Sequence, residues 1–323
     1  MSVIGRFAVL AAVLFAAQAA DAQTAYPSKP VRMIVPFAAG GATDTIARLI
    51  ANQLSISLRQ QFNIENHGGA GGNIGMGAAA GTPPDGHMIL TVSNSFYLNP
   101  SLYAKIPYSP EMDFAPLTLV ATSPYLLTVH PSIPAKTLLE FVALLKANPG
   151  KYSYASPGPG TPGHLAGELF RLPRKLDVTH VPFKGGNPAI TSTVGGHTPI
   201  SFSSLPTAAP HVKSGSLRAL AVLSPKRSPA LPDVPTAAEA GLPGLEVEII
   251  SGMLVRAGTP QPIIDLLHRE TAKAVALPDM ANRMDALGFV PVVNTPAEFG
   301  AWLQVELPKW AQVIRDANMK LAQ

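Results

Sequence analysis

The chain has 323 residues, of which 47% are hydrophobic and 14% charged, so it can bury one large core or the cores of two lobes. Its formal net charge is +4, but its basic residues form only isolated pairs such as Lys226-Arg227, without interleaved aromatic residues, and this argues against nucleic-acid binding. It contains no cysteine, which excludes disulfides, thiol catalysis, lipidation at an N-terminal cysteine and cysteine-ligated metals.

Residues 1–22 have the pattern of a secretory signal peptide. Arg6 gives a positive start, an apolar run follows from Phe7 to Ala19, and Ala20-Asp21-Ala22 offers a cleavage site. The run of about 13 residues is too short for a membrane anchor, which needs about 20. We therefore expect export to the periplasm and a mature protein that begins near Gln23, with no later membrane span.

After this segment, short apolar runs alternate with stretches of helical spacing. The runs at 31–37, 88–92, 125–129, 153–156, 178–183, 200–203, 217–223 and 247–255 predict strands. Helices are predicted over 43–60, 137–147, 262–276, 279–287 and 296–317, with further helical patterns between the strands. This alternation predicts an α/β protein with mostly parallel sheets and helices on both faces.

The domain organisation follows from the spacing of these elements. No long linker divides the chain, and we find no internal repeat. Residues 125–223 contain their own set of strands and helices, so we expect them to form a second lobe. Residues 23–124 and 224–323 would then share the first lobe, with two crossings between the lobes.

One strand-to-helix loop has the composition of an anion site. It runs from Pro36 to Asp44, and its candidate ligand-binding residues are Phe37, Ala39, Gly40, Gly41, Thr43 and Asp44. The two glycines allow the backbone to approach a ligand closely. Thr43 can cap the following helix, whose first N–H groups and dipole attract anions. The alternative is an ordinary strand–turn–helix connection.

Three further loops carry small polar residues where open α/β sheets bind ligands. Their candidate residues are Ser93, Asn94 and Ser95; Ser156, Gly158, Gly160, Thr161 and His164; and Ser203 and Ser204. Hydroxyl-rich helix starts without a clustered acid–base pair are more typical of a binding cleft than of a catalytic one.

The enzyme motifs in the sequence are weak. Gly158 to Gly163 matches G-x-G-x-x-G, but Pro157, Pro159 and Pro162 remove backbone donors that a pyrophosphate needs. There is no G-x-S-x-G elbow or phosphate loop, and the histidines lack metal-ligand spacing. We therefore expect no catalysis, no cofactor and no metal.

Ordered sequence blocks carry a family resemblance over nearly the whole mature chain. They include Tyr26-Pro-Ser-Lys-Pro-Val-Arg32, Val35-Pro-Phe-Ala-Ala-Gly-Gly-Ala-Thr-Asp44, Gly69-Ala-Gly-Gly-Asn-Ile-Gly75, Pro84-Asp-Gly86, Asn99-Pro-Ser-Leu-Tyr103, His164-Leu-Ala-Gly-Glu-Leu-Phe170 and His180-Val-Pro-Phe-Lys-Gly185. With these blocks the chain resembles the TctC/Bug-type receptors, the extracytoplasmic solute-binding components of tripartite tricarboxylate transporters.

The resemblance implies a two-lobe, type II-like periplasmic binding protein fold that closes by a hinge on a ligand in the interlobe cleft. It also implies that the loops 37–44 and 156–161 grip one carboxylate, largely through backbone N–H groups and water. The expected partners are a small carboxylate and the membrane subunits of the transporter, and we expect a monomer. Two departures lie on the ligand side: Phe202 is followed by Ser203-Ser204, and the second loop reads Pro157-Gly-Pro-Gly-Thr161.

The ligand is expected to lack an ammonium group. The loops at Ser93–Ser95 and Ser203–Thr207 offer only neutral side chains, whereas a buried ammonium needs a carboxylate partner or several acceptors. Lys184 adds positive potential, and Phe37, Phe96 and Phe183 could flank a ring or simply pack the lobes. We therefore predict a di- or tricarboxylate, with terephthalate as a specific candidate. The alternative function is a periplasmic sensor that uses the same cleft to feed a signalling partner.

Overall fold

The computed structural model describes residues 26–316, so the predicted signal peptide (1–22) lies outside the described residues. In chain order the elements are β1 (Val31–Val35), α2 (Ala42–Ser57), β2 (Phe62–Asn66), a short 3-10 turn (Ala70–Gly72), α3 (Asn73–Ala80), β3 (Met88–Val92), α4 (Ser95–Leu102), β4 (Phe114–Val129), α5 (Leu138–Ala147), β5 (Tyr152–Ser156), α6 (Pro162–Arg171), β6 (Val178–Pro182), α7 (Gly186–Val194), β7 (Ile200–Ser204), α8 (Leu205–Lys213), β8 (Arg218–Val222), β9 (Glu248–Arg256), α9 (Gln261–Ala276), α10 (Pro278–Ala286), β10 (Val290–Pro291) and α11 (Pro296–Asp316).

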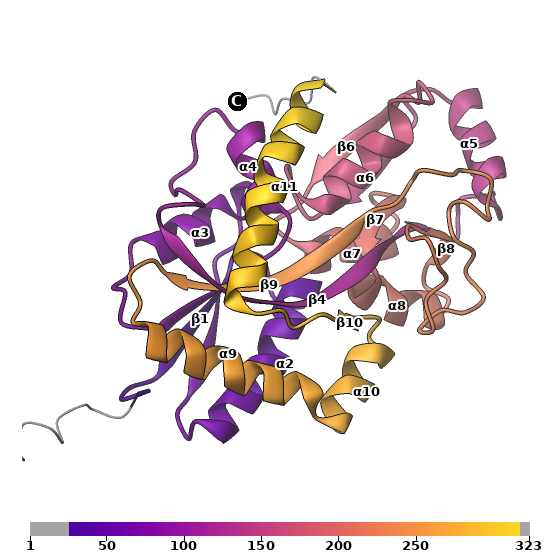
Figure 1. Ribbon diagram of the computed structural model, residues 1–323. Helices are drawn as coiled ribbons and strands as arrows, with labels where there is room; N and C mark the ends of the chain where they lie inside the picture. The colour runs from indigo at the N-terminus through magenta and orange to yellow at the C-terminus, as the bar shows by residue number, and fades with distance from the viewer. Residues whose placement is uncertain (1–25, 317–323) are drawn as a thin grey trace, which may run out of the picture.

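Two β-sheets share the long strand β4. The first sheet has the order β2-β1-β3-β9-β4, and the second has β4-β7-β5-β6, with β8 also paired to β4. The change of sheet falls within β4, where Pro124 pairs with Glu248 of β9 and Tyr125 pairs with Ser204 of β7. Figure 1 shows β4 and β9 side by side in the middle of the molecule, between the elements of the two sheets. Each sheet with its helices forms one lobe.

The sheets are mixed, which corrects the prediction that they are mostly parallel. Parallel pairing joins β1 to β2 and β3, and β5 to β6 and β7. β9 runs antiparallel to β3 and β4, and β4 runs antiparallel to β7, β8 and β10. The physical reason is that β4 and β9 carry the chain between the lobes in opposite directions, so neither continues the parallel β–helix–β series.

The helices bury the faces that their spacing predicts. In α2, Ile46, Leu49, Ile50 and Leu54 are each no more than 6% exposed. They belong to a core cluster that includes residues of β1, and each fully buried aliphatic side chain stabilises the fold by roughly 1.5–3 kcal/mol. Within residues 26–316, no helix combines the length and apolar character needed to cross a bilayer.

The two lobes repeat one architecture, although the sequence shows no repeat. The first three strands of the first lobe lie in the order β2-β1-β3, and those of the second in the order β6-β5-β7. In each lobe, the loops that leave the first and third strands begin at the carboxyl ends of parallel strands, where ligands bind in α/β folds. The ligand loops predicted from the sequence are these four.

The packing of residues 224–247 suggests where the lobes divide. Leu231 belongs to one core cluster with Leu126 and Leu205 of the second lobe, and Thr236 forms a bridge with Val222 of β8. We propose that the chain crosses first at Pro124 and again near Val247, which would assign 224–247 to the second lobe.

Candidate ligand-binding site

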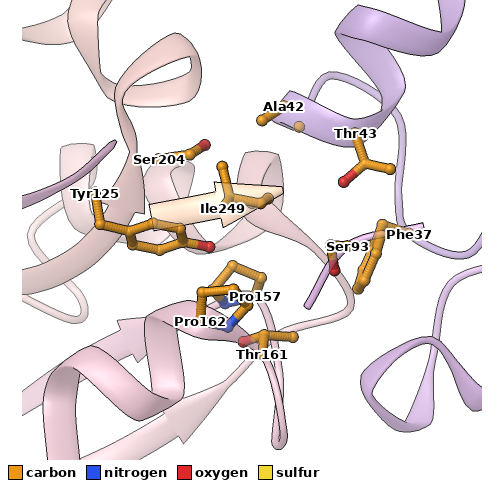
Figure 2. A pocket seen from close by; sticks show the side chains of 12 residues that line it. Phe37, Ala42, Thr43, Ser93, Tyr125, Pro157, Thr161, Pro162, Ser204 and Ile249 are labelled. Atoms are coloured by element: carbon orange, nitrogen blue, oxygen red, sulfur yellow. The ribbon is translucent and has the colours of Figure 1, made fainter. Parts of the chain in front are cut away.

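A small pocket lies between the lobes, where their loops meet. It is lined by Phe37, Gly41, Ala42, Thr43, Ser93, Tyr125, Pro157, Thr161, Pro162, Gly186, Ser204 and Ile249. Figure 2 shows Phe37 and Ser93 on one side and Tyr125 and Pro157 on the other. None of the lining side chains is charged. The cavity measures about 20 Å³, which is room for about one water molecule.

The first loop connects β1 to α2 and is held by Asp44. The Gly40 N–H donates to Asp44 Oδ2 at 2.9 Å, and Arg48 binds both carboxylate oxygens at 2.8 and 3.0 Å. Asn66 Nδ2 adds a bond of 2.8 Å to Oδ1. Burial alone would raise the pKa of Asp44, but these hydrogen bonds and the Arg48 charge together lower it. Asp44 therefore stays ionised and shapes the loop, and Gly40 takes the left-handed φ of 83° that this turn requires.

The second loop connects β5 to α6, and its own residues use most of its backbone donors. The Gly158 N–H donates to Ser156 Oγ at 3.2 Å, and the Gly160 N–H donates to His164 Nδ1 at 3.4 Å. The Thr161 N–H and hydroxyl both donate to Gly158 O, at 3.3 and 2.6 Å. The loop is thus a preformed turn, and the N–H groups of Gly158 and Gly160 are already paired within it, so they are not free for a ligand in the pocket.

Four helices begin at the pocket without a side-chain cap. The N-cap residues are Gly41 of α2, Thr161 of α6, Gly185 of α7 and Ser204 of α8, and none forms a side-chain cap hydrogen bond. The prediction that Thr43 caps α2 is therefore wrong, because the helix begins at Ala42 and Thr43 lies within its first turn. The first N–H groups of a helix have no partner within the helix, and the helix dipole adds positive potential there. Together these helix ends form a site suited to an anion.

The pocket gathers part of the predicted site. Phe37, Gly41, Thr43, Ser93, Thr161 and Ser204 line it. The other residues of the two glycine-containing loops, Ala39, Gly40, Asp44, Ser156, Gly158, Gly160 and His164, lie outside the lining, and several of them hold the loops as described above. Ser95 lies behind Ser93, with the two hydroxyl oxygens 3.2 Å apart.

The remaining predicted residues lie elsewhere. Asn94 uses its side chain to bind Tyr97 Oη, Glu248 O and the Ile250 N–H, so it links α4 to β9. The Ser203 hydroxyl pairs with that of Ser201. Phe183 is outside the lining, and Lys184 is exposed and outside it, so its ammonium does not face the pocket.

Tyr125 is the most informative lining residue that the sequence did not indicate. It is 1% exposed, and its hydroxyl oxygen accepts a hydrogen bond from the Gly163 N–H of α6. Burial raises the pKa of this hydroxyl, so it stays protonated at neutral pH. Its backbone also joins both crossings, since the Tyr125 N–H donates to Val247 O and its carbonyl accepts from Leu223. Its place as the first residue of a predicted strand gave no sign of either role.

The two lobes touch directly across the pocket. The Ala38 N–H of the first lobe donates to Lys184 O of the second at 3.0 Å, and Tyr103 Oη donates to Pro159 O at 3.3 Å. A Cβ atom at Gly160 would lie 2.2 Å from Asn99 Oδ1. This arrangement is a closed one, and the lobes must separate before a ligand larger than a water molecule can enter.

Comparisons with known proteins identify the family. The sequence model of one protein family, the tripartite tricarboxylate transporter family receptor (TctC), matches residues 46–319 of this chain. The chain belongs to this family. The family consists of solute-binding receptors and is not a family of enzymes. The resemblance seen in the sequence is therefore confirmed.

Solved structures agree. The periplasmic binding protein BugD is 35% identical with a TM-score of 0.88, over 92% of this chain and 100% of BugD. Rpa4515 of R. palustris, solved with adipate, is 31% identical with a TM-score of 0.88 over 92% of this chain and 100% of its own. MatC of Rhodopseudomonas palustris, solved with malate, is 33% identical with a TM-score of 0.84 over 90% and 100%. The predicted two-lobe periplasmic binding protein fold is confirmed.

Proposed function

We propose that this receptor captures a small carboxylate without an ammonium group in the periplasm and delivers it to the membrane subunits of a tripartite tricarboxylate transporter. The observation that carries the proposal is the meeting of four uncapped helix N-termini at a pocket without charged side chains. Backbone N–H groups and helix dipoles stabilise an anion there, without a lysine or arginine.

The lining also favours a ligand class. A bound amino acid would bury its ammonium group, and an unpaired buried charge is costly. The polar side chains of the lining are the hydroxyls of Thr43, Ser93, Tyr125, Thr161 and Ser204, which are neutral. They suit a second carboxylate or an uncharged polar end. Adipate and malate, with which two related structures were solved, are dicarboxylates without an ammonium group.

The lining also offers surfaces for an aromatic acid once the lobes part. Phe37 and Tyr125 offer flat surfaces on opposite sides of the pocket, and Pro157, Pro162 and Ile249 add apolar walls. Aromatic and proline side chains pack well against a planar ring. Terephthalate, a dicarboxylate with such a ring, is therefore our specific candidate beside the aliphatic di- and tricarboxylates.

Mass spectrometry of the purified and then denatured protein tests the ligand class. We expect it to release a carboxylic acid without an amino group. The Gly160→Val variant, whose side chain would collide with Asn99 at closure, is the matched control and should release far less of the same compound. Release of an amino acid, or equal release from both proteins, would contradict the proposed cleft.

A signalling role with the same cleft is the second candidate, and uptake by cells separates it from transport. A strain that lacks this receptor should lose uptake of the identified acid and regain it when the receptor is restored. Normal uptake combined with a lost transcriptional response to the acid would favour the sensor instead.

A further inference from the structure

A buried cluster of titratable residues supports the second loop from behind. The His164 ring of α6 stacks on the His180 ring of β6, with centroids 4.4 Å apart, and His180 stacks on Tyr154 of β5 at 4.8 Å. Glu168 accepts a hydrogen bond from Tyr154 Oη at 2.8 Å and binds Arg171 through both oxygens at 2.7 Å. None of these residues lines the pocket.

Both imidazoles connect to the loop through specific ring nitrogens. His164 Nδ1 accepts from the Gly160 N–H, so the proton of a neutral His164 sits on Nε2, which lies 3.9 Å from Glu168. Ser156 Oγ already accepts from the Gly158 N–H and lies 2.7 Å from His180 Nε2. The single Ser156 hydroxyl proton has two acceptors in reach, Gly158 O at 3.4 Å and His180 Nε2 at 2.7 Å, and we assign it to the shorter contact. The His180 proton then sits on Nδ1.

The surroundings keep both rings uncharged. Burial first, and then His164, lower the pKa of His180 to about 3. Burial also lowers the pKa of His164, and Glu168 opposes this only in part. The Glu168 charge is already neutralised by Arg171. From the first lobe, only the apolar side chains of Leu98, Leu102 and Ile314 share a small cavity with His164.

We infer that His164 and His180 are positioning residues, which hold the Pro157–Thr161 turn in shape by accepting hydrogen bonds as neutral imidazoles. His164 fixes Gly160 directly, and His180 fixes Gly158 through Ser156. A proton on His164 Nδ1 would turn the acceptor into a donor that faces the Gly160 N–H, so the turn would lose this support. The importance of the turn for ligand capture rests on the proposed function, whereas its dependence on the two rings does not.

Amide exchange measured by NMR tests the inference without any ligand, at Gly158 and Gly160. His164→Leu and His180→Leu remove the acceptors, and the protection of Gly160 and Gly158, respectively, should fall about tenfold. His164→Asn places an acceptor near the Nδ1 position and His180→Gln places one near Nε2, so both should retain protection to within about threefold. His211→Leu, at the far end of α8 and without a ring hydrogen bond to the loop, is the control.

Unchanged protection in the leucine variants, or equal losses in the leucine and amide variants, would overturn the inference in favour of simple packing. If the variants do not fold, ¹⁵N shifts of the imidazoles in the wild-type protein decide. We expect neutral rings at pH 7.5, with the proton on Nε2 of His164 and on Nδ1 of His180. The opposite tautomers, or a charged ring at that pH, would overturn it. Because no ligand is used, a failure here is distinct from a failure of the proposed function.

Discussion

At the scale of single residues, the pocket depends on which donors remain available. The Gly40, Gly158 and Gly160 amides are paired within their own lobes, and the Ala38 amide is paired across the cleft. What remains for an anion is the first-turn N–H groups of α2, α7 and α8 and the hydroxyls of the lining, because α6 begins with Pro162 and its Gly163 N–H is bound by Tyr125. The Tyr125 hydroxyl is one of these donors. Its oxygen accepts a hydrogen bond from the Gly163 N–H, so its proton can be donated toward the cleft.

The Tyr125→Phe variant tests this donor. Removing one hydrogen bond to a charged acceptor should weaken carboxylate binding about tenfold, which corresponds to about 1.4 kcal/mol. The Gly163 N–H also loses its acceptor, so stability should fall by about 1 kcal/mol while the fold persists. Calorimetry measures the first effect and thermal unfolding the second.

Tyr152→Phe is the matched control, because Tyr152 lies on β5 outside the pocket lining and should keep the affinity of the wild type. Equal affinities of Tyr125→Phe and Tyr152→Phe would show that the Tyr125 hydroxyl does not meet the ligand.

At the scale of the elements, closure brings α4 of the first lobe against the β5–α6 loop of the second. Asn99 of α4 is fully buried and donates to Gly71 O and Asn73 Oδ1, while its Oδ1 has no partner among the described residues. Gly160 packs so closely there that a Cβ atom would lie 2.2 Å from Asn99 Oδ1, so a side chain at this position must displace the Asn99 amide or push the two lobes apart.

Two glycines with nearly the same positive φ allow the effect of blocked lobe closure to be distinguished from the effect of backbone strain. Gly160 has φ 74° and Gly215 has φ 75°, but a Cβ atom at Gly215 would meet nothing within 4 Å. Alanine at either position should cost about 1 kcal/mol of stability. Only Gly160→Ala should also weaken binding of the carboxylate, by about tenfold or more, since it opposes closure.

Unfolding and calorimetry on both variants check this pair. If Gly215→Ala weakened binding as much as Gly160→Ala, general strain would be the cause, and the lobe contact would not matter.

The sequence predicted the elements that follow simple periodicity and missed those that break it. The helical spacing of α2 and the glycine-rich loops after β1 and β5 were correctly placed. The first half of β4 was missed, because Pro116 and Pro124 argue against a central strand. The structure tolerates Pro116 beside an irregularity in the register and Pro124 where the strand changes sheets.

Roles that depend on contacts between distant segments could not be predicted. Tyr125 looked like any strand residue, and its contact with Gly163 depends on the packing of β4 against α6. His180 lies in one of the sequence blocks that carry the family resemblance, but its role could not be predicted. The residues that it contacts, Ser156 and His164, belong to other elements and are distant in the sequence. Lys184 was misplaced for the same reason, since its loop turns its side chain to the solvent.

At the scale of the whole molecule, the two crossing strands allow the lobes to move as units. Within residues 26–316, only β4 and the segment that leads into β9 connect the sheets, and the two hydrogen bonds described across the cleft both end on backbone carbonyl groups. Such a molecule can exchange an open form for the closed one described here, and a ligand that contacts both lobes shifts the balance towards closure.

Solution scattering measures this motion. Saturation with the carboxylate should reduce the radius of gyration of the wild type, and the reduction should be smaller for Gly160→Ala than for Gly215→Ala. If the ligand-free wild type has a larger radius of gyration than the closed form, and that radius stays unchanged at saturation, hinge closure is contradicted.

Export is tested by the intact mass of the protein recovered from the periplasm. The pattern of residues 1–22 predicts a mass that corresponds to a chain beginning near Gln23. A mass that includes residues 1–22 would contradict a cleaved signal peptide.

A cleft of neutral side chains and uncapped helix ends should select carboxylates without an ammonium group. Calorimetry against malate, adipate, citrate, terephthalate, aspartate and glutamate tests it most directly. We predict that at least one of the first four binds with a Kd near 1 μM, equivalent to about 8 kcal/mol, and that the two amino acids bind at least a hundredfold more weakly. Micromolar binding of aspartate or glutamate, without binding of any of the four unaminated acids, would contradict it.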